Sequence, residues 1–163
     1  VILWNEWARL YHWMARDEEA FQRCIDRSLE LDPGFDQTWL LLGDVRAERG
    51  DLEGAAAAYR MGLELNPTQP IVWNALGRIH LQLEQNQEAI EAFSYALELN
   101  PTAAEAWDWH RMLAIAYYQE GSLEQALLEA QWALQLAPED QQPLVAQLLQ
   151  QMQQPFPVEE TTP

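Results

Sequence analysis

A short proline-terminated motif recurs along this chain of 163 residues at a nearly constant spacing. Segments of the form Leu-Asp-Pro, Leu-Asn-Pro or Leu-Ala-Pro end at Pro33, Pro67, Pro101 and Pro138. The intervals between these prolines are 34, 34 and 37 residues, and a tryptophan follows the first three by six residues, at Trp39, Trp73 and Trp107. A fixed period of this length indicates a repeat protein, in which each unit is one supersecondary element.

The composition predicts that these units are helical. Val, Ile and Thr together make up 16 of the 163 residues, whereas Leu, Ala, Glu and Gln dominate, which favours helix over strand. Each recurring proline ends a helix because it cannot continue the backbone hydrogen-bond ladder. The predicted helix pairs are 2–15 with 17–31, 35–49 with 52–65, 69–84 with 86–99, and 103–120 with 122–136.

Seven positions recur together in the two central units. Trp39, Leu42, Gly43, Ala55, Tyr59, Gly62 and Pro67 are matched at the same spacing by Trp73, Leu76, Gly77, Ala89, Phe93, Ala96 and Pro101. This pattern resembles the tetratricopeptide repeat (TPR), a helix-turn-helix unit of 34 residues. The resemblance implies an all-α fold, a right-handed α-solenoid of about four TPR units with a C-terminal capping helix. The small residues would let paired helices approach closely, and the aromatic ones would fill the gaps between pairs.

The repeat frame also gives the expected domain organisation. A TPR domain spans 1–153, with repeats at about 2–34, 35–68, 69–102 and 103–138. A capping helix follows over 139–153, with Leu144, Val145, Leu148, Leu149 and Met152 on one stripe and glutamines opposite, because an open solenoid end needs a polar-backed cap. Residues 154–163 are predicted to be a flexible acidic and proline-rich tail. We expect the tight turns within pairs at Arg16, Gly50, Asn86 and Gly121.

The outer repeats depart from the 34-residue period. The first has one extra residue before Pro33, and the fourth has three extra residues between Trp107 and Leu113. Three residues are close to one helical turn of 3.6. The insertion therefore predicts a seventh helix extended by a turn, with a local π-type irregularity or a functionally neutral length variant as alternatives.

The family resemblance implies where a partner would bind. In TPR arrays the first helix of each pair lines a concave groove, with groove-facing side chains near the fifth, ninth and twelfth positions of each repeat. In this sequence they map to Asn5, Arg9, His12, Leu40, Asp44, Asn74, Arg78, Leu81, Asp108 and Tyr118. The Asn and Arg of repeats one and three are four residues apart, so each pair projects from one helix face. They could hold a peptide carboxylate and backbone; the alternative is that the arginines pair with acids of their own array.

Two further aromatic residues are candidates for the groove. Trp13 and Trp109 fall toward the two ends of the predicted groove, and large amphipathic rings are frequent anchors at protein interfaces. The alternative for both is packing, against an absent N-terminal neighbour or within the lengthened seventh helix.

Charge and composition exclude several classes of function. Twenty-six acidic residues against nine basic ones, all arginine, give a net charge of −17, which argues against binding nucleic acid or an anionic membrane. No apolar run approaches the roughly 20 residues that span a bilayer, so we expect no membrane insertion of this segment. The single cysteine and three dispersed histidines do not form a metal site, and no catalytic grouping or phosphate loop occurs. We therefore expect no enzyme activity, no metal and no cofactor.

The leading hypothesis is a non-catalytic protein–protein interaction module, a scaffold, adaptor or assembly factor that binds a peptide or helix in its groove. The alternative is a structural or self-association domain, forming a homo-oligomer within a larger bacterial protein. The segment Trp4 to Tyr11 is similar to repeat segments in soluble tails of some O-antigen ligase or polymerase-like membrane proteins. The expected location is the cytoplasm, as a free protein or as the soluble domain of a membrane-associated one.

Overall fold

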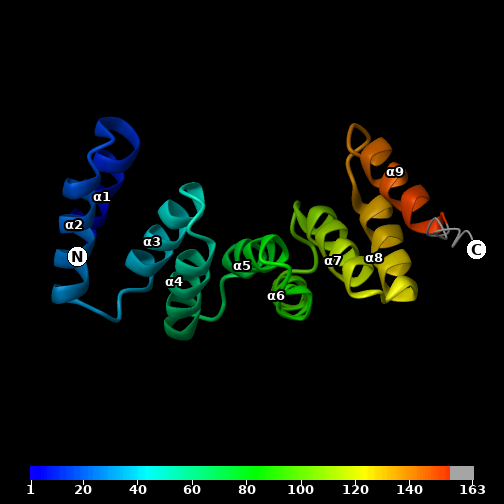
Figure 1. Ribbon diagram of the computed structural model, residues 1–163, viewed down its shortest axis with the longest axis horizontal. Helices are drawn as coiled ribbons and strands as arrows, with labels where there is room; N and C mark the ends of the chain where they lie inside the picture. The colour runs from blue at the N-terminus through cyan, green and yellow to red at the C-terminus, as the bar shows by residue number, and fades with distance from the viewer. Residues whose placement is uncertain (155–163) are drawn as a thin grey trace, which may run out of the picture. The chain divides into compact units, whose positions relative to one another are not determined.

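The computed structural model describes residues 1–154, and all regular elements in that part of the chain are helices (Figure 1). The described chain divides into two compact units. The first is Val1–Gln85, and the second begins at Asn86 and is described as far as residue 154. The tail predicted over 154–163 lies outside the described residues except for Gln154.

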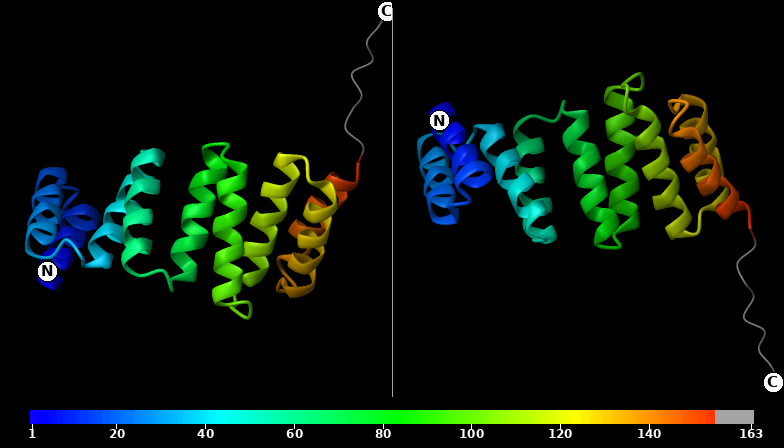
Figure 2. Two further views of the ribbon diagram at one scale, coloured as in Figure 1. Left: turned by 90° about the horizontal axis from the view of Figure 1, so that it is seen from below. Right: turned by 90° about the horizontal axis from the view of Figure 1, so that it is seen from above.

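The first unit contains two helical hairpins and one further helix. Its elements are α1 (Ile2–Arg9), η1 (Leu10–Ala15), α2 (Glu18–Leu31), α3 (Asp36–Glu48), α4 (Leu52–Leu65) and α5 (Pro70–Gln82). The second helices of both hairpins have side-chain N-caps, because Asp17 Oδ1 accepts from the backbone N–H of Ala20 at 2.9 Å and Asp51 Oδ1 from that of Gly54 at 3.1 Å. The helices of the unit pack side by side (Figure 2).

The extra residue of the first repeat is absorbed in a π-helix. η1 continues α1 with wider turns, and the backbone N–H groups of Arg16 and Asp17 both donate to the carbonyl of Tyr11. Such a segment accommodates one additional residue without ending the helix. The left-handed turn residue Arg16 consequently lies twelve residues after Trp4, whereas Gly50 lies eleven after its repeat's tryptophan.

The second unit contains α6 (Asn86–Leu99), α7 (Ala106–Glu120), α8 (Leu123–Leu136) and α9 (Gln142–Gln153). The three-residue insertion lengthens α7 to 15 residues, against 13 for α3 and α5, and also lengthens the preceding turn. No π-helix occurs in α7 itself. Trp109, rather than Trp107, is the fourth residue of its helix, as Trp39 and Trp73 are of theirs. Counted from the helix start, Trp109 thus corresponds to Trp39 and Trp73, although Trp107 keeps their spacing of six residues from the preceding proline.

Two further details correct the sequence prediction. The turn expected at Asn86 has its left-handed residue at Glu84, with φ of 59°, and Asn86 begins α6. The capping helix buries Val145 and Met152, but Leu144 from the same predicted stripe is 49% exposed. Leu144 stands in the first turn of α9, ahead of the turns that pack on the alanines of α8.

Small residues are central to both hydrophobic cores. In the first unit, Ala8 of α1 and Ala58 of α4 are buried in one core with Phe21 of α2 and Leu41 of α3. In the second, Ala114 of α7 and the alanines of α8 are fully buried beneath Met152. Side chains this small let the helix axes come close, which explains the alanine-rich second helices.

Candidate functional site

Three of the predicted groove residues meet at a cavity in the first unit. Arg9 of α1 and Leu40 and Asp44 of α3 line a cavity of about 210 Å³. The structure adds residues that the repeat positions did not indicate. These are Gln37, Leu41, Tyr59, Ile71, Val72 and Ala75. The floor and one wall are therefore apolar, and Arg9 and Asp44 supply opposite charges. We refer to this set as the groove cavity.

The cavity is shaped by close packing between α3 and α4. A Cβ on Gly43 would lie 2.6 Å from the Tyr59 ring, and one on Gly62 would lie 2.4 Å from Leu40. Neither space is available to a larger residue, so these two glycines let Tyr59 lie flat against α3 and let Leu40 lie against α4. Leu40 and Tyr59 both line the groove cavity, so the repeat's glycines set the position of its walls.

Tyr59 positions the acidic group of the cavity. Its hydroxyl donates a hydrogen bond of 2.8 Å to Asp44 Oδ1. Desolvation by burial raises the pKa of the Asp44 carboxyl above its usual value, and the charge of Glu48 adds to this, whereas the bond from Tyr59 and the charge of Arg9 act in the opposite direction. Burial and the neighbouring carboxylate also raise the pKa of Tyr59, so the hydroxyl remains a donor. Asp44 is thus a fixed hydrogen-bond acceptor beside an apolar floor.

The structure places Asn5 away from the groove surface. Asn5 is 4% exposed, and its Oδ1 accepts hydrogen bonds of 3.0 Å from both Ser28 and Thr38. Ser28 and Thr38 are themselves 2.8 Å apart and fully buried. The Asn5 amide is therefore part of a buried polar cluster between the first two hairpins, and the prediction that it grips a peptide is corrected.

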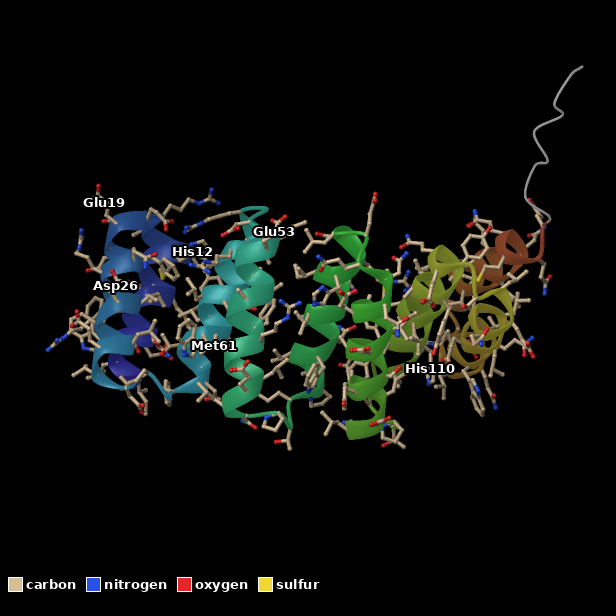
Figure 3. All side chains as sticks on the ribbon, turned by 60° about the horizontal axis from the view of Figure 1, so that its bottom comes forward. His12, Glu19, Asp26, Glu53, Met61 and His110 are labelled. Atoms are coloured by element: carbon tan, nitrogen blue, oxygen red, sulfur yellow. The ribbon has the colours of Figure 1, made fainter. Side chains whose placement is uncertain are left out.

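His12 and Trp13 lie at a second cavity of about 270 Å³, together with Arg16, Glu18, Glu48 and Arg49. His12 is on the side of the first hairpin that faces α3 (Figure 3), where its Nε2 is 2.9 Å from Glu48. Trp13 is 47% exposed, and its indole N–H donates to Glu48 at 3.4 Å. The hydrogen bond from His12 lowers the pKa of Glu48. Both residues thus hold Glu48 in place, which is a local structural role.

The remaining predicted residues fall on α5 and α7. On α5, Arg78 is exposed, and Asn74 and Leu81 are half-buried. Asn74 Oδ1 is buried and has no hydrogen-bond partner among the described residues. On α7, Tyr118 is half-buried, and Asp108 accepts from the Arg111 Nε at 2.9 Å.

Trp109 is a core residue of the second unit. Its exposed fraction is 2%, so its ring is not available to a partner. The shift of the helix start by the insertion turns this position inward. Trp109 therefore packs in the core and does not anchor a partner, as the alternative to the groove prediction had it. Trp13, by contrast, keeps an exposed ring.

Ile71 is the groove residue that sequence reasoning missed most clearly. Its side chain is 71% exposed at the mouth of the cavity, although isoleucine is usually buried. It lies three residues before Asn74, a predicted groove position, and residues three apart share a helix face. This helical spacing from Asn74 could have identified it.

Comparison with known proteins agrees with the helical repeats. A family model described as TPR repeat matches residues 43–84, and one described as Tetratricopeptide repeat matches residues 74–141. Together they cover more than half of the chain. No curated protein matches the chain significantly. The architecture is that of an all-α helical-repeat protein, and the chain belongs to the tetratricopeptide repeat family.

Solved structures show the same fold. A crystal structure of MamA protein superimposes with a TM-score of 0.81 at 19% identity, covering 93% of this chain and 79% of that one. MamA from Desulfovibrio magneticus RS-1 gives 0.79 at 20% identity, covering 93% and 82%. PilF from Pseudomonas aeruginosa gives 0.73 at 20% identity, covering 93% and 66%. The predicted fold class, an all-α solenoid of TPR hairpins, is confirmed.

Repeats of this family are protein-interaction modules and typically have no catalytic role. None of the helices within residues 1–154 combines the length and hydrophobicity needed to cross a membrane.

Proposed function

We propose that this chain is a non-catalytic interaction module that binds a peptide segment of a partner protein in the groove cavity. The observation that carries the proposal is the convergence of Arg9, Leu40 and Asp44 from two successive repeats at one cavity with an apolar floor. All three residues are also groove positions of the repeat frame.

The chemistry of the cavity defines what such a segment would present. An apolar side chain would enter between Leu40 and Ile71 and cover the exposed isoleucine, which gives most of the binding free energy. Arg9 offers a planar fork to a carboxylate, and Asp44, already oriented by Tyr59, accepts from a backbone or side-chain N–H. The two opposite charges then set the direction of the bound segment.

A selection from a random peptide library tests the proposal. Peptides retained by the immobilised protein are synthesised, and their dissociation constants are measured for the wild type and for Ile71→Asp. We expect a loss of at least about 10-fold, because a charge replaces the apolar contact. Leu128→Asp on α8 is the matched control, since Leu128 is also exposed, by 53%, but lies in the other unit.

The result is specific to this site. Equal affinity of the selected peptides for the wild type and Ile71→Asp would contradict the groove-cavity proposal, as would a loss seen only with Leu128→Asp. Circular dichroism of both variants establishes that the helices are retained. A second variant, Arg9→Glu, should favour peptides with a basic residue where the wild type selects an acidic one.

A further inference from the structure

An apolar face is exposed on the first helix of the chain. Leu3, Trp4, Trp7, Leu10, Tyr11 and Met14 follow helical spacing along α1 and η1 and define what we term the N-terminal face. The exposed fractions are 73% for Leu3, 49% for Trp7 and 78% for Met14. Such large side chains are seldom left open together unless the surface binds something.

The repeat itself shows that this face is normally covered. Trp7 occupies the position of Leu42 in the second repeat and of Leu76 in the third, which are only 6% and 3% exposed. Leu42 belongs to one core with Phe21 and Ile25 of the preceding hairpin's second helix. In the first repeat the described chain provides no such helix, so the same position is open.

The N-terminal face combines projecting side chains with a cavity. A cavity of about 340 Å³ is lined by Leu3, Trp4, Trp7 and Tyr11, with the buried Cys24 of α2 as its remaining wall. Trp7 and Tyr11 stack with ring centroids 5.9 Å apart, which keeps one wall rigid. Met14 and Leu10 continue the face beyond the cavity. A surface with both a hollow and projecting apolar groups can be complementary to itself.

Charge favours a second copy of this chain at this face. Residues 1–16 carry one acid and two bases, a net charge of +1, so the rest of the chain carries −18. At some other exposed apolar surfaces two copies would meet acid against acid. On α8, for example, the exposed Leu128, Trp132 and Leu136 are accompanied by Glu124 and Glu129 and by no base. Like-charge repulsion between copies is therefore smaller at the N-terminal face than at the exposed apolar face of α8.

We propose that the N-terminal face is a dimerisation surface, which binds the same face of a second copy of this chain in a two-fold, isologous interface. Its exposed apolar side chains present on the order of 400 Å² per copy. Homodimer interfaces are roughly 65% apolar by area. Two such faces would therefore bury about 1,200 Å² of total surface, polar area included. That is the lower end of specific interfaces, so the dimer is reversible with a micromolar dissociation constant.

Sedimentation equilibrium measures this association directly, over protein concentrations from about 1 to about 100 µM. The wild type should shift from monomer to dimer. Trp7→Glu should raise the dissociation constant by at least about 30-fold, because an isologous interface loses the contact on both sides. Trp132→Glu is the matched control, since Trp132 is 46% exposed, and it should leave the constant unchanged.

A second variant and a second measurement keep the test independent of folding. Met14→Glu changes a side chain that is 78% exposed, and it should weaken the dimer with helix content unchanged. Cys24 is the only cysteine and lines the cavity, so its labelling by a thiol reagent should slow as the wild-type concentration rises. Burial already raises the pKa of this thiol, which makes the reaction slow enough to follow.

Two outcomes would overturn the proposal. One is a monomeric mass at every concentration with a Cys24 labelling rate that does not change, which would assign the face to a helix that does not belong to residues 1–163. The other is a dimer that Trp132→Glu disrupts and that Trp7→Glu and Met14→Glu leave intact.

Discussion

At the scale of single residues, one contact explains why the repeat has a glycine at position 43. Gly43 of α3 faces the ring of Tyr59, and the same tyrosine orients Asp44 in the groove cavity. The recurring spacing of Trp39, Gly43 and Tyr59 thus reflects the way in which α3 and α4 pack against each other. A residue that looks structural in the sequence also determines the geometry of the proposed binding site.

Gly43→Ala should therefore destabilise the protein. The new Cβ would lie 2.6 Å from the Tyr59 ring, which is itself buried and cannot move outward freely. We expect a loss of about 1–3 kcal/mol in the free energy of unfolding, measured by urea titration with circular dichroism. Gly34→Ala is the control, because its Cβ would meet only the exposed Asp32 carboxylate at 3.3 Å; a similar loss there would refute the packing explanation.

At the scale of elements, the π-helix η1 differs from the corresponding turns of the other hairpins. Its last turn is followed by Arg16 in the left-handed region, and its side chains His12 and Trp13 both contact Glu48 at the end of α3. The Arg49 guanidinium next to Glu48 pairs with Glu18 at the start of α2. Polar contacts thus connect the ends of three elements where the extra residue interrupts regular packing.

This arrangement predicts a pH dependence. The hydrogen bond from His12 lowers the pKa of Glu48 below its usual 4.5, so the folded state favours the ionised carboxylate. Its contribution to stability is present above pH 4.5 and is lost as the pH falls through the lowered pKa. The difference in unfolding free energy between the wild type and Glu48→Gln should shrink between about pH 7 and about pH 3.

The size of this effect is limited by solvent. The Glu48 side chain is 52% exposed, so screening keeps its contribution small. Glu53→Gln, at an exposed position in the first turn of α4, serves as the control. A Glu48→Gln difference that stays constant across the pH range, or that matches the Glu53→Gln difference, would rule out the His12–Glu48 explanation.

At the scale of the whole molecule, charge is distributed unevenly. Most of the excess acid lies on second helices and turns, and Glu19 and Asp26 of α2 and Glu53 of α4 project into solvent (Figure 3). Glu19 pairs with Arg23 at 3.6 Å, but nine arginines cannot pair with all 26 acids of the chain. Repulsion among them opposes the compact state.

Salt should consequently stabilise this protein. Raising NaCl from about 0.01 M to about 0.1 M shortens the screening length from about 30 Å to about 10 Å. The melting temperature should then rise by a few degrees. A Glu91→Gln, Glu98→Gln double variant on α6, a helix that carries no base, should melt higher at low salt and respond less to NaCl. A melting temperature that falls with NaCl would contradict this view of the charge.

The helices were predictable from sequence because proline, glycine and apolar spacing act locally. Most predicted helices match the observed ones within one to three residues, as at 52–65 and 86–99. The groove was predicted in part: Arg9, Leu40 and Asp44 meet at one cavity, whereas Asn5 and Trp109 are buried. The Trp109 error occurs where repeat length deviates, because a position assigned by counting is rotated about the helix axis by each inserted residue. Asn5 precedes the extra residue of its repeat, and it is buried because Ser28 and Thr38 lie opposite it.

The sequence by itself determined that this protein is a helical repeat of the TPR family with an acidic surface, since the period, the small-residue positions and the charges are properties of the chain alone. Tertiary structure decided which side chains are accessible. A π-helix absorbed one extra residue and a longer α7 absorbed three, and packing closed over Trp109 but left Trp7 open. Burial depends on what lies opposite a residue in space, and a repeat pattern does not specify that.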